Sequence, residues 1–176
     1  MSANDPGLSD FIAGMRAGDF SAQASRFDGN PSLVQQWDQQ GAFAALPAIR
    51  AEALTCACFL GKVGVATYLL DQGVRPVGGA GTGLNALHWA VNRGQLEAVE
   101  LLIARGADLE QKSRYDGTAL GTAVWSAINE PRPTHRAIIV RLLAAGARVA
   151  DAGYPSGNAE IDALLRRRGV GPAIET

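Results

Sequence analysis

The chain has 176 residues, with 16 basic and 17 acidic side chains and a formal net charge of −1. This length fits one domain with a sizeable core, and the near-neutral balance argues against a strong electrostatic hold on nucleic acid or on an anionic membrane. No apolar run reaches the ~18 residues that a membrane helix needs, and residues 1–10 are polar and lack a secretion signal.

The chain contains only two cysteines, Cys56 and Cys58, so it has no disulfide framework. We therefore expect a cytoplasmic protein. The richness in Ala, Gly, Leu and Arg is typical of a bacterial source.

The N-terminal 43 residues predict an irregular pair of helices. Ser9 can cap a first helix over about residues 10–17, and Asn30 followed by Pro31 starts a second helix that runs to about residue 40. The inward positions of the two helices are Phe11, Ile12, Met15, Leu33, Val34 and Trp37. Residues 19–29 form an insertion between them. We expect this unit to cover one end of a stack of repeats.

A regular period begins after this unit. Leu54, Leu87 and Leu120 follow one another at intervals of 33 residues. The same interval separates Ala53, Ala86 and Ala119, and also Ala57, Ala90 and Ala123. Several residue types in one register predict stacked copies of one supersecondary unit.

Residues 84–110 hold the most regular copy. Apolar residues recur at helical spacing over 86–91 and over 99–103, and a glycine follows each helix. The segment 85–90, Asn-Ala-Leu-His-Trp-Ala, resembles the Thr-Pro-Leu-His-x-Ala motif of ankyrin repeats, and 99–108 resembles the Val-x-Leu-Leu-x-x-x-Gly-Ala-Asp signature of that family.

The resemblance implies an all-α ankyrin-repeat solenoid of helix-turn-helix units with divergent N- and C-terminal caps. It divides a single domain, residues 1–176, into a divergent N-terminal repeat (8–43), repeats at 44–76, 77–110 and 111–149, and a C-terminal cap (150–169).

The repeat at 44–76 is predicted to have helices near 52–60 and 63–72. The linker that follows, 73–83, contains Gly78, Gly79, Gly81 and Gly83. A phosphate-binding loop would need a Lys-Ser or Lys-Thr pair entering a helix, which is missing here. A turn that tolerates positive φ is therefore the better interpretation.

The repeat at 111–149 carries seven extra residues between its helices, which we place at 129–135. Pro131 and Pro133 predict a stiff loop that protrudes from the stack, with His135 in solvent. The second helix then spans about 134–144.

The C-terminal cap is predicted to be one helix over about 160–168. Ile161, Leu164 and Leu165 face inward, and the arginines at 166–168 face outward before Gly169. Positive charge near a helix C-terminus is favoured by ~0.3–1 kcal/mol. This structural role is a better explanation of the arginines than nucleic-acid binding.

Chemistry-bearing residues are few. His88 occupies the family's histidine position, which implies that its ring joins neighbouring loops by hydrogen bonds. Cys56 and Cys58 point about 200° apart on one helix and cannot hold a metal together. We expect no catalytic residue, no metal and no cofactor, so the sequence favours a non-catalytic protein.

The resemblance also implies that a partner meets the loop tips and the first helices on the concave side. Counting from the repeated leucines, the partner-binding residues are Phe59, Leu60, Leu84, Asn92, Arg93, Arg114, Tyr115 and Trp125. Aromatic residues and arginine are enriched at interface hot spots. The alternative at one end is that the 19–29 insertion folds over Phe59 and Leu60.

These observations predict a monomer that recognises another protein, with no nucleic acid or membrane as partner. Small bacterial ankyrin proteins are often immunity or adaptor proteins, so these are the specific hypotheses. The alternative is an enzyme or small-molecule binder with a pocket in the groove, closed by the loop at 129–135.

Overall fold

The fold is that of a computed structural model, which describes residues 6–77 and 82–169. Across these residues the secondary structure consists of helices, and none of them forms a strand, which confirms the all-α class. The α-helices are α1 (Pro6–Ala17), α2 (Ala24–Gly29), α3 (Leu33–Gln39), α4 (Pro47–Phe59), α5 (Val63–Asp71), α6 (Ala86–Asn92), α7 (Leu96–Ala104), α8 (Ala119–Asn129), α9 (His135–Ala144) and α10 (Ala159–Gly169), with 3-10 helices η1 (Ser21–Gln23) and η2 (Val149–Asp151).

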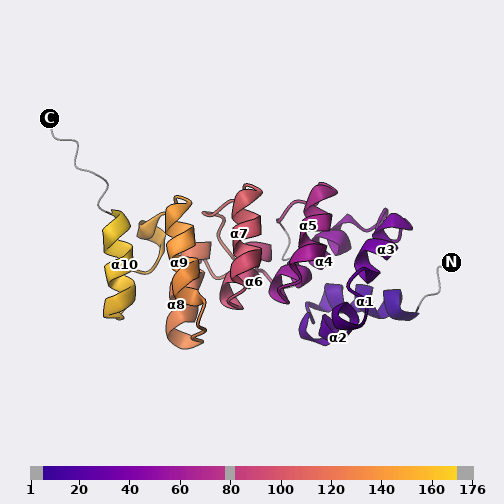
Figure 1. The fold of residues 1–176 in the computed structure, drawn as a ribbon, viewed down its shortest axis with the longest axis horizontal. Helices are drawn as coiled ribbons and strands as arrows, with labels where there is room; N and C mark the ends of the chain where they lie inside the picture. The colour runs from indigo at the N-terminus through magenta and orange to yellow at the C-terminus, as the bar shows by residue number, and fades with distance from the viewer. Residues whose placement is uncertain (1–5, 78–81, 170–176) are drawn as a thin grey trace.

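The helices form two parallel rows along an elongated stack (Figure 1). In one row α1 packs on α4, α4 on α6, and α6 on α8. In the other row α3 packs on α5, α5 on α7, α7 on α9, and α9 on α10. Within each row the main packing contacts join successive helices, which is the architecture of a repeat solenoid.

The central pair shows how local sequence defines a repeat. The Asn85 side chain caps α6 by accepting a hydrogen bond from the backbone N–H of His88 at 3.0 Å. Gly94 has a positive φ of 71°, which side chains other than glycine disfavour. This backbone conformation lets the chain turn from α6 into α7.

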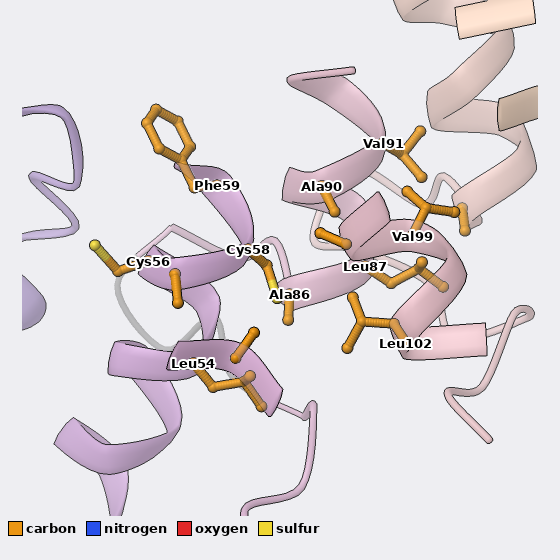
Figure 2. Packing of buried hydrophobic residues seen from close by; sticks show 14 of the residues in the cluster. Leu54, Cys56, Cys58, Phe59, Ala86, Leu87, Ala90, Val91, Val99 and Leu102 are labelled. Atoms are coloured by element: carbon orange, nitrogen blue, oxygen red, sulfur yellow. The ribbon is translucent and has the colours of Figure 1, made fainter. Parts of the chain in front are cut away.

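The repeated positions form the core. The leucines at 54, 87 and 120 and the six alanines of the same register are at most 1% exposed. Figure 2 shows Leu87 beside Val99 and Leu102, where the two helices of one repeat meet. Cys58 points toward Ala86, whereas Cys56 points the other way, as the helical spacing predicts (Figure 2).

The N-terminal unit differs from the prediction in its helix starts. Ser9 lies inside α1, which already begins at Pro6, so it is not the cap. The residue before α3 is Ser32, while the Asn30 side chain accepts a hydrogen bond from the Ser32 N–H in the turn ahead of it. The proposed insertion at 19–29 is itself partly helical, as η1 and α2.

A cluster of aromatic rings holds this unit together. The ring centroid of Phe11 lies 5.3 Å from Trp37, 6.1 Å from Phe43 and 6.3 Å from Phe27. All four rings are at most 4% exposed. Phe27 therefore anchors α2 to the stack, so the insertion is a packed element.

Helix bounds elsewhere follow the sequence closely, with one exception. Helix α4 begins at Pro47, more than one turn before its predicted start, because proline suits the first position of a helix. In α10, Ile161 and Leu165 are buried and Arg166 and Arg167 are exposed, as predicted. Gly78, Gly79 and Gly81 of the linker lie outside the described residues.

In the described parts of the chain no helix is long and apolar enough to cross a membrane.

We predict that Leu87→Ala lowers the free energy of unfolding by ~2–5 kcal/mol, because it opens a cavity in the middle of the stack. Thermal unfolding followed by circular dichroism measures the effect, and the whole transition should move to lower temperature because the repeats depend on their neighbours. Ile128→Ala removes a side chain of similar size that is 40% exposed, and should cost much less. Equal melting temperatures for the two variants would contradict the packing described here.

Candidate functional site

A groove of about 980 Å³ lies over the C-terminal half of the stack. It is lined by Leu84, Trp89, Asn92, Arg93, Ser113, Tyr115, Gly117, Gly121, Thr122, Val124, Trp125, Ile128, Asn129, Glu130, Asp151, Ala152, Gly153 and Ser156. These residues come from α6, α8, the loops before them and the segment around η2. Leu84 and Tyr115 precede the two helices and Arg93 and Glu130 follow them, so the groove runs along the row of first helices.

The N-terminal half of the same row is covered. The Phe20 ring, from the turn after α1, makes edge contacts with Phe59 at 5.7 Å and with Trp89 at 6.3 Å. Phe59 is only 8% exposed. The expectation that Phe59 contacts a partner is therefore wrong for this structure, and the alternative in which the insertion folds over it is correct.

The cover reaches the third repeat along the chain. Gly18 has φ of 70°, and a side chain there would collide with Thr82, 2.6 Å from the position of its Cβ. The Thr82 hydroxyl accepts a hydrogen bond from the Trp89 indole N–H at 3.0 Å. The turn after α1 thus lies against the residues that hold Trp89, and Trp89 forms the end wall of the groove.

Arg93 stands beside this wall. Its guanidinium carbon lies 4.7 Å from the centroid of the Phe59 ring, a cation–π contact. Phe59 is also in edge contact with Trp89 at 5.0 Å. The buried ring is therefore a platform that fixes two groove residues, although it does not line the groove itself.

The predicted contact residues divide into two groups. Leu84, Asn92, Arg93, Tyr115 and Trp125 are brought together in the groove. Leu60, which is half-buried, and Arg114, which is exposed, lie outside its lining.

The apolar centre of the groove is formed by Trp125 and Ile128, with exposed fractions of 53% and 40%. Ile128 was missed because the contact positions were counted from the repeated leucines, and its equivalent in the regular repeat, Gln95, lies beyond the end of α6. One helical turn separates the two positions, so a longer helix would have placed them on one face. Asp151 and Ser156 were missed because the segment around η2 has no counterpart in the other repeats.

The seven extra residues of the fourth repeat form the predicted loop only in part: residues 130–133 are exposed, but the insertion also lengthens α8. Helix α8 has 11 residues where α6 has 7, so four of them lengthen the helix. The helix ends at Asn129 because Glu130 precedes Pro131, and a residue before proline disfavours helical angles. After residues 130–133 the chain returns to the preceding repeat, where the Thr134 hydroxyl donates a hydrogen bond to the Gly94 carbonyl at 2.7 Å.

His135 is buried at 1% exposure, so the expectation of a solvated ring is wrong. Its Nδ1 accepts from the Arg132 N–H and its Nε2 lies 3.2 Å from the Asn92 carbonyl oxygen. These partners fix the neutral ring with its proton on Nε2. Burial lowers the pKa of His135, and the Arg132 guanidinium lowers it further.

The position of His135 follows from the register. Gln95 donates from Nε2 to the Phe59 carbonyl at 3.2 Å, and Phe59 precedes Asn92 by one period of 33 residues. His135 follows Gln95 by one period plus the seven inserted residues. Gln95 and His135 thus each bond to the equivalent carbonyl oxygen of the preceding repeat. His135, which we placed in the insertion, is therefore part of the packed stack.

His88 behaves as the family resemblance implies. Its Nδ1 lies 2.8 Å from Asn85 Oδ1, and its Nε2 lies 3.0 Å from the Gly117 carbonyl oxygen in the next repeat. Burial lowers its pKa, against hydrogen bonds to carbonyl oxygens that raise it. The equivalent residue of the preceding repeat, Thr55, donates instead to the Ala51 carbonyl of its own helix. It therefore does not form the link to the next repeat that His88 forms.

The site offers little reactive chemistry. Among residues 6–77 and 82–169, no group of three or more His, Cys, Asp or Glu side chains is placed to hold a metal ion. Burial raises the pKa of both thiols, that of Cys58 to about 12. Both cysteines are therefore protonated at neutral pH and lie in the core.

Comparison with known families agrees with this geometry. The family model described as Ankyrin repeats (3 copies) matches residues 22–113 and 76–152, well over half of the chain. The chain belongs to the ankyrin-repeat family. No curated protein matches it. Ankyrin repeats generally serve as protein–protein interaction modules, and the groove lies along their row of first helices.

We predict a pH dependence of stability from His135. Because its folded pKa lies below the unfolded value of about 6.5, its contribution is complete above that pH and is lost as the pH falls toward the folded pKa. Urea unfolding between about pH 8 and about pH 5 should show this decline.

The matched variant is His135→Gln, because glutamine makes the equivalent bond at position 95. It should lose less stability than the wild type over the same pH interval, since the two proteins differ only in the ionisable group at position 135. Identical pH profiles would mean that His135 does not titrate in the folded stack.

Proposed function

We propose that this ankyrin-repeat protein is a non-catalytic recognition module that binds another protein in the groove over α6 and α8. The observation that carries the proposal is the exposure of Trp125, Ile128 and Tyr115 along one groove, at 53%, 40% and 72%. Exposed apolar surface of this kind on a folded monomer marks interaction sites. Tryptophan, tyrosine and arginine are the residues that most often dominate binding energy.

The backbone around Trp125 is held in place by hydrogen bonds, as is expected of a residue that anchors a partner. Its helix is held at the groove base by Asn92, whose Nδ2 donates to the Ser126 hydroxyl at 3.1 Å. Asn129 donates to the Trp125 carbonyl at 2.8 Å at the helix end. A tryptophan on a fixed backbone loses little entropy when it is buried by a partner.

The finer hypothesis is an immunity or adaptor protein in a bacterial cytoplasm, which acts by covering a surface of its partner. It rests on analogy with small ankyrin proteins. The enzyme alternative required the inserted loop to close a pocket. Of residues 129–135, Asn129 and Glu130 line the groove. Thr134 and His135 instead bond to the preceding repeat, which favours recognition over catalysis.

We predict that Trp125→Ala weakens partner binding by about thirtyfold or more, since truncating an aromatic anchor typically costs at least ~2 kcal/mol. The fold should survive because the side chain is exposed. A pull-down with the wild-type chain identifies the partner, and titration calorimetry then compares the variants.

The control is Arg167→Ala, on the exposed face of α10 and away from the groove, which should change the affinity little. Equal affinities of wild type and Trp125→Ala would place recognition on another surface.

A further inference from the structure

The charged side chains of the groove differ in how far they are already neutralised. Asp151 faces two cations, Lys112 at 4.0 Å and Arg148 at 3.4 Å. Glu130 accepts a long hydrogen bond from Asn92 Nδ2 at 3.5 Å. Arg93 forms no ion pair with any residue in the described part of the chain. Its guanidinium instead lies against the ring of Phe59.

This contact leaves Arg93 ready to bind an anion. The guanidinium carbon lies 4.7 Å from the centroid of the Phe59 ring, and an aromatic ring does not use up the N–H donors with which an arginine binds a carboxylate in a bidentate manner. The ring is itself held by Phe20 and Trp89, so the guanidinium loses little freedom on binding. Arg93 also lines the groove together with Trp125.

From this arrangement we propose that the groove binds a segment of a partner protein that presents a carboxylate to Arg93 and an apolar side chain to Trp125 and Ile128. The proposal rests on the proposed function and names the partner's chemistry. Glu130, which follows α8, repels a second carboxylate at its own end of the groove. The segment therefore binds in one orientation, with its acidic residue toward α6.

A polyanion fits this site less well than a single carboxylate. Glu130 and Asp151 lie in the lining of the same groove, and the chain as a whole carries a net charge of −1. A nucleic acid would bring phosphates against both acidic side chains. A protein segment with one acidic residue next to an apolar one avoids this repulsion.

The test uses a displayed library of random peptides, panned against the full-length chain. Peptides whose affinity falls with Trp125→Ala are the groove binders. We expect them to share an aspartate or glutamate close to an aromatic or aliphatic residue. Changing that acidic residue to its amide should weaken binding at least about tenfold, as should Arg93→Gln, because each removes the same charge-assisted pair.

The two changes together should cost little more than either alone, since both delete one interaction. Arg167→Gln is the matched control: it makes the same change from arginine to an amide on the exposed face of α10, outside the groove, and should leave the affinity unchanged. Circular dichroism checks that Arg93→Gln is folded. If that variant does not fold, the amide peptides on the wild-type chain decide the question.

The outcomes separate the two proposals. Groove-binding peptides that lack a carboxylate, or that ignore Arg93→Gln, overturn the carboxylate site and leave groove recognition intact. Panning that yields no peptide sensitive to Trp125→Ala overturns both. Selection of peptides with basic residues in place of acidic ones would assign the charge recognition to Glu130 and would also overturn the Arg93 site.

Discussion

The structure depends on close contact between successive first helices at buried alanines. Ala53, Ala86 and Ala119 occupy one such position, and Ala57, Ala90 and Ala123 the other, and all are at most 1% exposed. A methyl group at both positions lets α4, α6 and α8 approach closely, and the leucine next to each first alanine fills the space toward the second row. Because each repeat is buried mainly by its neighbours, the stack needs specialised ends. The aromatic cluster around Phe11 and the helix α10 supply them.

The exposed groove results from two insertions that act differently on the row of first helices. The N-terminal insertion places Phe20 over Phe59 and Trp89, which removes the α4 part of the groove from solvent. The insertion in the fourth repeat has the opposite effect, because it lengthens α8 and adds Ile128 to the exposed face beside Trp125. Both insertions fall between the two helices of a repeat, where extra residues do not interrupt the stacking. The exposed part of the groove is thereby confined to α6 and α8.

The sequence predicted the repeats well because the residues that recur with the period, the leucines and alanines of the first helices, are all buried in the core. It also predicted that Leu84, Asn92, Arg93, Tyr115 and Trp125 share one groove. It could not decide the state of Phe59, since that depends on a contact with Phe20, 39 positions earlier in an irregular segment. The inserted residues at 129–135 were misplaced because two prolines suggested a loop. The register of Lys62 and Gln95, continued past the insertion, reaches His135 and would have indicated its buried role.

Fluorine NMR of the chain labelled with fluorotryptophan tests the location of the binding surface most directly, because its three tryptophans report on three environments. Trp37 is buried in the N-terminal cluster, Trp89 forms the end wall of the groove, and Trp125 is exposed at its centre. When a protein partner or a selected peptide binds, the Trp125 resonance should shift and become insensitive to exchange of H₂O for D₂O, while the Trp37 resonance stays in place. A Trp125 resonance that remains unchanged and solvent-sensitive at saturation would contradict recognition in this groove.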